Sequence, residues 1–233
     1  MYDVIRTFNA SYIILDLVFV LAFLLILLLR RKWIPLAAFF IGGLFINFFV
    51  DWGIWYHTGI REIYLPASFL SNISLSIKTV LFMLWFSLSY GVEYAYVFLM
   101  FEKKSNKYFW TAIVFIGWIL IGFLSQYLPL NNDNIQVIRH MSDLRYLRII
   151  LVIAGYSLLF IFKYDYKKIG YLFFVGFIIH FMMEFSLLIN NIRPGSMWIL
   201  IENSLVEFNM GIPFFYLLYD KVLKPKSISK SDM

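Results

Sequence analysis

The feature that most constrains this chain is a series of seven apolar segments, each about as long as a lipid bilayer is thick. A hydrocarbon core of about 30 Å requires roughly 20 helical residues. The segments cover about residues 10–29, 33–54, 79–101, 108–128, 146–162, 168–190 and 197–219. With 62% hydrophobic and only 15% charged residues, the chain has more apolar surface than a soluble domain can bury. The sequence therefore predicts an all-α, multi-pass integral membrane protein.

Several classes of protein are excluded by what surrounds these segments. The first segment, Tyr12 to Leu29, is followed by Arg30-Arg31-Lys32 and not by a small-residue cleavage site, so it is interpreted as a retained helix. The chain has no cysteine, which excludes a thiolate nucleophile and a zinc–cysteine site. Its net charge of +6 is concentrated in short loops beside apolar segments. That pattern orients a membrane protein, so no nucleic-acid partner is predicted.

The distribution of basic residues predicts the orientation in the membrane. If the C-terminus is cytoplasmic, the inner loops and tail hold 13 of the 20 lysines and arginines, and the outer side holds 7. The inner loops are short and rich in lysine, as the positive-inside rule requires. We therefore expect an external N-terminus, one seven-helix domain over residues 1–220, and a basic cytoplasmic tail over 221–233. Of the two long outer connections, 55–78 is expected to lie partly in the membrane interface. The other, 129–145, is expected to be a solvated loop with one helical turn at most.

Six acidic residues lie inside the predicted helices, and no lysine or arginine accompanies them in the apolar cores. At about 2.5–3.5 kcal/mol for a charge near the bilayer centre, six isolated carboxylates would be too costly. They must face one another, face water or carry protons. These residues are Asp16, Asp51, Glu93, Glu184, Glu202 and Glu207.

Helical spacing predicts that these acids share a site with other polar groups. Asn47 and Asp51 are four residues apart and therefore lie on one helix face, as do His180 and Glu184. On the last helix, Glu202, Asn203, Glu207 and Asn209 fall within an arc of roughly 160°. On the third, Ser87, Tyr90, Glu93 and Tyr94 share a narrower arc. The sequence thus predicts a polar cavity among the first, second, third, sixth and seventh helices, widest toward the outer face, with the fourth and fifth facing lipid.

Each polar group also has a purely structural interpretation. His180 and Glu184 fit an interhelical hydrogen bond as well as a proton-transfer pair. A metal site is disfavoured, because the stretch HFMME does not match H-E-x-x-H and the other histidines lie in outer loops. Asp51, beside Trp52, fits either an interfacial position or a functional carboxyl bonded to Asn47. Asp16 is interpreted as structural. No metal and no cofactor is predicted.

The seventh helix holds the strongest functional candidates. Glu202 and Glu207 would lie in apolar, like-charged surroundings, where a carboxyl group can hold a proton near neutral pH. Pro213 removes a backbone donor near Asn209 and predicts a bend there. Glu93, among tyrosines, fits a packed, protonated acid equally well.

One stretch resembles a known family. The sequence Asn47-Phe48-Phe49-Val50-Asp51 is similar to the Asn-x-x-x-acid pattern late in helix 2 of the small membrane-bound terpene cyclases of meroterpenoid and indole-diterpene pathways. Those proteins are also short seven-helix chains with a further essential acid in helix 7, which here would be Glu202 or Glu207. The family has a Trp before a Glu, whereas here Trp52 follows an Asp. The resemblance implies protonation of an isoprenoid alkene or epoxide by a neutral carboxylic acid, with aromatic faces shielding the cation.

The leading hypothesis is therefore an intramembrane, terpene cyclase-like enzyme whose partner is a membrane lipid or an isoprenoid small molecule. Asp51 and either Glu202 or Glu207 would act as general acids, with His180 and Glu184 relaying protons to them or orienting them. The residues expected to bind substrate are Asn47, Trp52, Tyr90, Glu93, Tyr94, Asn203 and Asn209. Two alternatives remain: a proton- or cation-coupled transporter or channel with an acidic cavity, and a seven-helix receptor-like protein. The transporter is weakened by the lack of a repeat relating the two halves.

Overall fold

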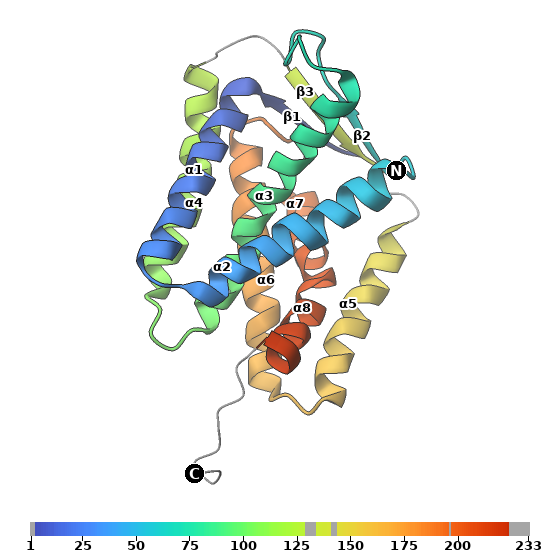
Figure 1. The fold of residues 1–233 in the computed structure, drawn as a ribbon. Coiled ribbons are helices and arrows are strands. Elements are labelled where there is room, and N and C mark those ends of the chain that lie inside the picture. Colours follow the sequence, from blue (N-terminus) through green and yellow to red (C-terminus); the bar gives the residue numbers. More distant parts are fainter. Residues whose placement is uncertain (1–2, 129–133, 141–143, 196, 224–233) are drawn as a thin grey trace.

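The computed structural model describes residues 3–128, 134–140, 144–195 and 197–223. Figure 1 shows a bundle of helices with a small β-sheet across one end. The N-terminus lies beside this sheet, and the short turns between α1 and α2, α3 and α4, and α5 and α6 lie at the opposite end. We call these two ends the sheet end and the lysine end.

Five of the seven predicted segments form helices that are long and apolar enough to cross a membrane, by length and composition. They are α1 (Ala10–Leu29), the continuous segment Trp33–Tyr56, α3 (Leu75–Phe101), α4 (Lys107–Tyr127) and α6 (Tyr166–Ile189). We call Trp33–Tyr56 helix 2. It comprises α2 (Trp33–Phe39) and two π-helical stretches, η1 (Phe40–Asn47) and η2 (Phe49–Tyr56). Such wide turns are rare and frequently occur at functional sites.

The other two predicted segments are also helical, but neither is one long helix. The fifth, α5 (Leu144–Ile161), is shorter. The seventh comprises α7 (Met197–Val206), a 3-10 turn η3 (Phe208–Met210), α8 (Ile212–Leu218) and a π-helical turn η4 (Tyr219–Leu223). We call these four pieces helix 7. Pro213 lies in the first turn of α8, so the bend expected near Asn209 is present as a break between α7 and α8. The predicted tail lies outside the described residues beyond Leu223.

The sheet corrects the prediction of an all-α fold. Its strands are β1 (Val4–Asn9), β2 (Arg61–Tyr64) and β3 (Asn134–Arg139), all antiparallel in the order β1-β3-β2. The segment 55–78, predicted to lie partly in the membrane interface, supplies β2. The segment 129–145, predicted to be a solvated loop, supplies β3, although residues 129–133 and 141–143 lie outside the described part. A bundle that is mainly helical is confirmed.

Alternation along the strands explains which side chains face the bundle. In β1, Val4, Arg6 and Phe8 are buried and alternate with half-buried residues, and β3 buries Ile135, Val137 and Arg139 in the same way. Successive side chains of a strand point to opposite faces, so one face of the sheet packs on the helices. The backbone N–H of Thr7 donates to the carbonyl oxygen of Ile192 at 2.8 Å, which ties β1 to the connection between α6 and α7. The sheet therefore carries arginine side chains toward the interior of the bundle.

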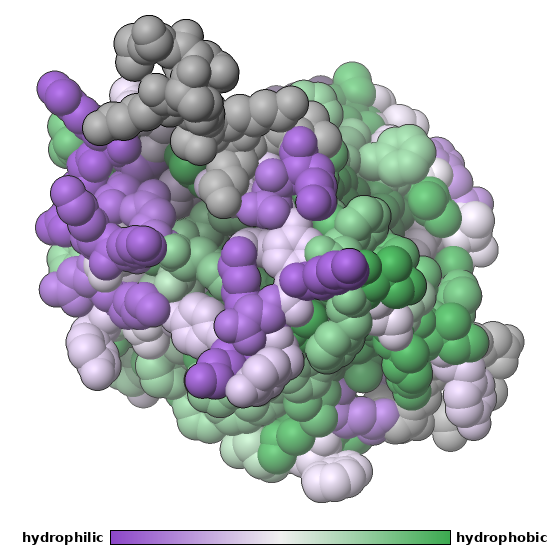
Figure 2. Space-filling model, turned by 90° about the horizontal axis from the view of Figure 1, so that it is seen from below, coloured by the Kyte–Doolittle hydropathy of each residue, from purple (hydrophilic) through white to green (hydrophobic). Residues whose placement is uncertain are grey.

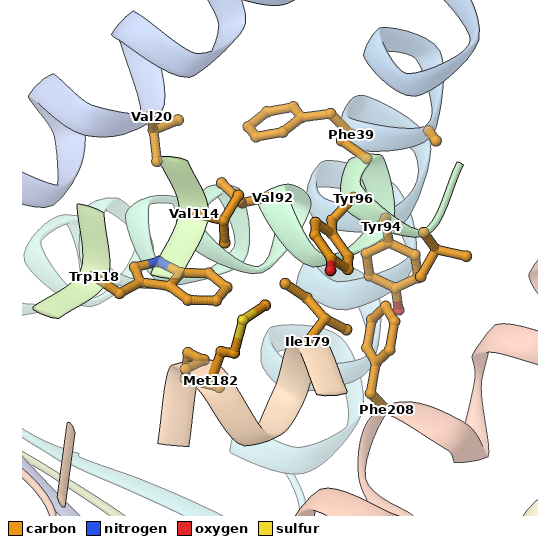
Figure 3. Close-up of a cluster of buried hydrophobic side chains, with 14 of the residues drawn as sticks. Val20, Phe39, Val92, Tyr94, Tyr96, Val114, Trp118, Ile179, Met182 and Phe208 are labelled. Atoms are coloured by element: carbon orange, nitrogen blue, oxygen red, sulfur yellow. The ribbon is translucent and has the colours of Figure 1, made fainter. Parts of the chain in front are cut away.

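The apolar core surrounds α3. Figure 3 shows Val92 of α3 among Val20 of α1, Val114 and Trp118 of α4, and Ile179 of α6. All five side chains are buried. Because neighbours cover α3 between Phe82 and Met100, Ser87 and Glu93 are held inside the protein and do not reach its surface.

The surface separates apolar flanks from polar ends. The outward faces of the helices carry large exposed apolar side chains, such as Val18, Leu21 and Leu25 of α1. The view from below in Figure 2 shows hydrophilic side chains gathered on the lysine end, where Lys103 and Lys163 are exposed. The loops assigned to the two membrane sides from charge alone thus lie at opposite ends of the bundle.

Two glycines allow helix 2 and α3 to touch backbone to backbone. A Cβ added at Gly43 would lie 2.7 Å from the Cα of Gly91 and 2.8 Å from the carbonyl oxygen of Ser87. Backbone atoms cannot move aside as a flexible side chain can, so the two helices would have to separate. This contact fixes the position of Asn47 and Asp51, one and two turns further along helix 2, relative to α3.

We expect Gly43→Ala to destabilise the protein by about 1–3 kcal/mol, the usual cost of overpacking a close contact. Gly170→Ala on α6 is the matched control, because a Cβ there meets nothing within 4 Å. Thermal unfolding of both variants in detergent micelles measures the difference. Equal unfolding temperatures for the two variants would show that the helices do not depend on this contact.

Candidate functional site

A cavity of about 120 Å³ lies where helix 2, α3, α6 and the break in helix 7 meet the sheet. We call it the central cavity. Six residues singled out from the sequence line it: Asn47, Asp51, Tyr90, Tyr94, His180 and Glu207. Of the eight further lining residues, Trp55, Arg61, Arg139 and Phe208 supply charged and aromatic side chains that were not anticipated. Acidic groups from separate elements therefore do meet at one aromatic-walled cavity, but arginines meet them there.

Asp51 is held by one partner from its own helix and one from the sheet. The Nη2 of Arg61 donates to Asp51 Oδ1 at 2.8 Å, and the Nδ2 of Asn47 donates to Asp51 Oδ2 at 3.1 Å. The expected Asn47–Asp51 hydrogen bond is thus present. Both oxygens of Asp51 already accept, and the residue is almost completely buried.

Glu207 stands at the break in helix 7 and has two guanidinium partners. Arg139 of β3 donates to its Oε2 at 2.5 Å, and Arg148 of α5 donates to its Oε1. The break itself is secured by Asn209, whose Oδ1 accepts from the Tyr156 hydroxyl at 2.6 Å while its Nδ2 donates to the carbonyl oxygen of Leu205 at 3.1 Å. The helix α5, which was expected to face lipid, therefore contributes Arg148 and Tyr156 to the polar interior.

Glu184 also has two guanidinium partners. Arg6 of β1 donates to its Oε1 at 2.6 Å, and Arg193, just after α6, donates to its Oε2. Arg6 further donates to the Tyr90 hydroxyl oxygen at 2.7 Å. The side chains of Glu184, Arg6 and Arg193 are all nearly inaccessible to solvent.

His180 lies between two buried glutamates, Glu93 and Glu184. Its Nδ1 lies 3.1 Å from Glu93 Oε2, and its Nε2 lies 3.5 Å from Glu184 Oε1. Its ring is stacked on that of Tyr90, with centroids 6.5 Å apart and planes 16° from parallel. Glu93, His180 and Glu184 thus form one polar cluster, and the rings of His180 and Tyr90 lie beside each other at the wall of the central cavity.

The prediction that no basic residue accompanies the buried acids is wrong. Five arginines form ion pairs with the buried acids: Arg6, Arg61, Arg139, Arg148 and Arg193. Three of them arrive on the strands that cover the sheet end, which is why a reading of the apolar segments alone omitted them. The expectation that Glu207 would have apolar, like-charged surroundings fails for the same reason.

Burial and charge act differently on these guanidinium groups. Burial lowers the pKa of Arg6, but attraction to Glu184 and contact with Tyr90 outweigh it, so the pKa rises above its ordinary value. The pKa values of Arg61 and Arg139 are lowered, first by burial and then by a neighbouring guanidinium group. For Arg61 that neighbour is Arg139, and for Arg139 it is Arg6. The cost of burying the charge of Arg6 is thus more than offset by its partners, whereas the cost of burying Arg61 and Arg139 is not fully offset.

Not every predicted site residue reaches the central cavity. Glu93 lines a neighbouring cavity of about 20 Å³ together with Arg6 and Tyr90, large enough for one water molecule. Trp52 stacks on Tyr56 instead, with centroids 4.7 Å apart. The remaining predicted residues on helix 7, Glu202, Asn203 and Asn209, are not among those that line the cavity; Glu202 is half-buried, and the other two are buried. Asp16 lies apart, where it accepts from the indole N–H of Trp85 at 2.9 Å.

One signal in the sequence could have indicated the arginines. The seven basic residues assigned to the outer side are six arginines and a single lysine, whereas the inner side has eleven lysines and two arginines. Arginine is preferred for buried ion pairs because its planar group is always charged and donates in a fixed fork. An arginine bias on one side of a membrane protein therefore suggests that these residues are structural or functional and not only orienting.

Comparison of the chain with protein-family models, with curated proteins and with solved structures finds no match. Across the described residues, no group of three or more His, Asp or Glu side chains is placed to hold a metal ion. The chemistry of the site has therefore to be argued from its own geometry.

We expect Glu184→Gln to cost about 3–5 kcal/mol of stability, because it leaves Arg6 and Arg193 buried without their shared counter-charge. Glu102→Gln is the matched control, since its ion pair with Lys32 is partly exposed and should contribute no more than about 1 kcal/mol. Thermal unfolding in micelles compares the two. A loss at Glu184 no larger than that at Glu102 would contradict a buried, closely packed ion cluster.

Proposed function

We propose that this chain is a multi-pass integral membrane enzyme that performs acid–base chemistry on a lipid-soluble substrate. The membrane part rests on five helices of sufficient length and apolarity and on the lysine-rich loops gathered at one end. In this proposal α5 and helix 7 complete seven crossings. The sheet end lies outside and the lysine end lies in the cytoplasm.

The observation that carries the enzymatic proposal is the meeting of hydrogen-bond donors and acceptors from separate elements at one small cavity. Tyr90 and His180 stand on one side of it, and Asp51 and Glu207 are anchored around it. Trp55, Tyr94 and Phe208 supply aromatic wall. Buried ionisable groups in a membrane protein are costly and are retained mainly for function.

Tyr90 is the group best placed to give a proton. Its oxygen accepts from Arg6, which leaves its own O–H free to donate toward the cavity. His180, bonded to Glu93 and with its ring beside that of Tyr90, is a second proton donor at the cavity wall. General acids must lie within hydrogen-bond reach of the reacting group, and both residues line the cavity.

The carboxylates take a different role from that expected of a terpene cyclase-like acid. The side chains of Asp51 and Glu207 already accept from guanidinium groups, which favours a role as proton acceptors over one as donors. In the proposed reaction, Tyr90 protonates an alkene carbon or an epoxide oxygen, and the resulting cation faces aromatic rings. A carboxylate then removes a proton elsewhere in the molecule. One proton is given and one is taken, so the product is an isomer and no cofactor is consumed.

An apolar groove supports entry of such a substrate from lipid. The groove has a volume of about 530 Å³ and runs between α1 and α3, lined by residues such as Ile13, Leu17 and Leu88. Trp85 lines both this groove and the small cavity that contains Arg6 and Tyr90. A hydrocarbon chain in the groove would therefore lie one side chain away from the polar site.

The alternative of a cation-coupled transporter is less well supported. Its attraction was an acidic cavity without fixed positive charge, whereas Arg61 and Arg139 line the central cavity. These two guanidinium groups pair with Asp51 and Glu207 and so offset the negative charge that would attract a cation. For a receptor-like protein, the described residues offer no observation in its favour.

The proposed orientation can be tested because the chain has no native cysteine. Thr58→Cys at the sheet end should react with a membrane-impermeant maleimide in intact cells, and Lys103→Cys should react only after permeabilisation. Both positions are exposed. The reverse pattern would place the sheet in the cytoplasm.

The enzymatic proposal is tested by incubating membranes containing the protein with prenylated quinols, isoprenoid epoxides and prenyl phosphates, followed by mass spectrometry and chromatography for isomeric products. We expect turnover by the wild type and a loss of at least 100-fold in Tyr90→Phe, in line with the usual contribution of a general acid. Tyr96→Phe is the control, because Tyr96 is buried on the same helix but bonds Thr111 away from the cavity. Product formation that is unchanged in Tyr90→Phe would remove Tyr90 from the mechanism. Unaltered substrate throughout the panel, with folded protein, would oppose the enzymatic proposal itself.

A further inference from the structure

We infer that the central cavity binds an oxyanion, a phosphate or carboxylate group, through Arg61 and Arg139. This deepens the proposed function, on which it rests, by naming the charged group of the substrate. It is tested by binding and not by turnover, so either proposal can fail without the other.

The first observation is the placement of two like charges side by side in a buried site. Arg61 of β2 and Arg139 of β3 are directly opposite in the sheet register. Their side chains are 2% and 5% exposed. Both guanidinium groups lie over the same Trp55 ring, with Cζ 5.5 and 5.6 Å from its centroid. Like charges directly opposite on neighbouring strands repel each other, but Asp51 and Glu207 each offset one of them. Two buried guanidinium groups are thereby held side by side at the cavity wall.

The second observation is that, among the described residues, both arginines have guanidinium nitrogens without a hydrogen-bond partner, as the buried Arg6 and Arg193 also do. Within the described part of the chain, the Nε of Arg61 and both the Nε and one terminal nitrogen of Arg139 are buried and have no hydrogen-bond partner. Buried polar groups are normally satisfied, and an exception calls for an explanation such as an unseen ion. A bound oxyanion provides several acceptors in the fork geometry that guanidinium groups favour.

The third observation is the balance of charge. Among the described ion pairs, Glu207 is shared by two arginines, Arg139 and Arg148, and Glu184 is likewise shared by Arg6 and Arg193. Asp51 has Arg61. Arg139 is therefore the arginine that both lines the central cavity and shares its carboxylate with a second guanidinium group.

The size and walls of the cavity indicate what carries the oxyanion. A volume of about 120 Å³ is comparable to that of cavities of about 150 Å³ that hold benzene. It fits one phosphate or carboxylate group and not a whole lipid. The remaining walls include Ile46, Val50 and Met210, which suit an attached hydrocarbon. The ligand class is therefore an apolar molecule with one anionic head.

The test uses purified protein in phosphatidylcholine nanodiscs and measures binding by calorimetry and by the shift in unfolding temperature. Farnesyl phosphate and farnesoic acid are the anionic probes, farnesol is the neutral probe, and inorganic phosphate is the free anion. We expect farnesyl phosphate to bind at least 10-fold more tightly than farnesol. Inorganic phosphate that displaces it with equal affinity would support the anion site and assign it to a free anion; weaker displacement would support a lipid-borne head group.

Arg139→Gln should weaken binding of farnesyl phosphate at least 10-fold, while Glu207 keeps Arg148 as a partner. Arg193→Gln is the matched control, because Arg193 is also buried and also shares its glutamate with a second arginine, but it does not line the cavity. It should leave the dissociation constant within twofold. Equal affinity for farnesol and farnesyl phosphate, or undiminished binding in folded Arg139→Gln, would overturn the inference. If Arg139→Gln does not fold, the comparison of the two ligands on the wild type decides.

Discussion

The structure depends on the pairing of buried guanidinium and carboxylate groups between the sheet and the helices. Each ion would cost several kcal/mol to bury alone, so neither the arginines of β1, β2 and β3 nor the acids of the bundle can be stably buried without the other. Arg6 meets Glu184, Arg61 meets Asp51, and Arg139 meets Glu207. Each strand thus contributes one arginine that forms an ion pair with a carboxylate of one helical segment. The sheet is for this reason part of the site as well as its cover.

Much of the bundle could be predicted from the sequence, because apolar length and charge asymmetry act locally. Helix existence, the break near Asn209 and the Asn47–Asp51 hydrogen bond all follow from spacing along a single segment. The sheet could not be predicted in the same way. Its strands are short, and β1 pairs with β3 across more than a hundred residues. The alternation of buried residues in a short strand, such as Ile135, Val137 and Arg139 in β3, is also a weaker sequence signal than an apolar run of about 20 residues.

The prediction of a purely acidic site was wrong for the same reason, because most of its arginines lie on the strands and loops. Spacing and depth along each helix correctly indicated that Asp51, Tyr90, His180 and Glu207 line one cavity. The arginines of the loops, however, were interpreted only as charges that orient the chain. Once Arg61 and Arg139 are in place, Asp51 and Glu207 are each paired at the cavity wall, and an acidic cavity becomes one in which both signs of charge meet. The properties of the cavity therefore depend on the buried arginines as much as on the buried acids.

The long separation between paired strands and helices also has a consequence for biosynthesis. Arg6 and Glu184 are 178 residues apart, so at about 5–20 residues per second the ribosome needs on the order of 10–35 s to supply the partner. Under the proposed topology, β1 stays unpaired on the far side of the membrane until β3 and α6 have been made. The ion cluster, and the cavity beside it, would therefore form only late in synthesis.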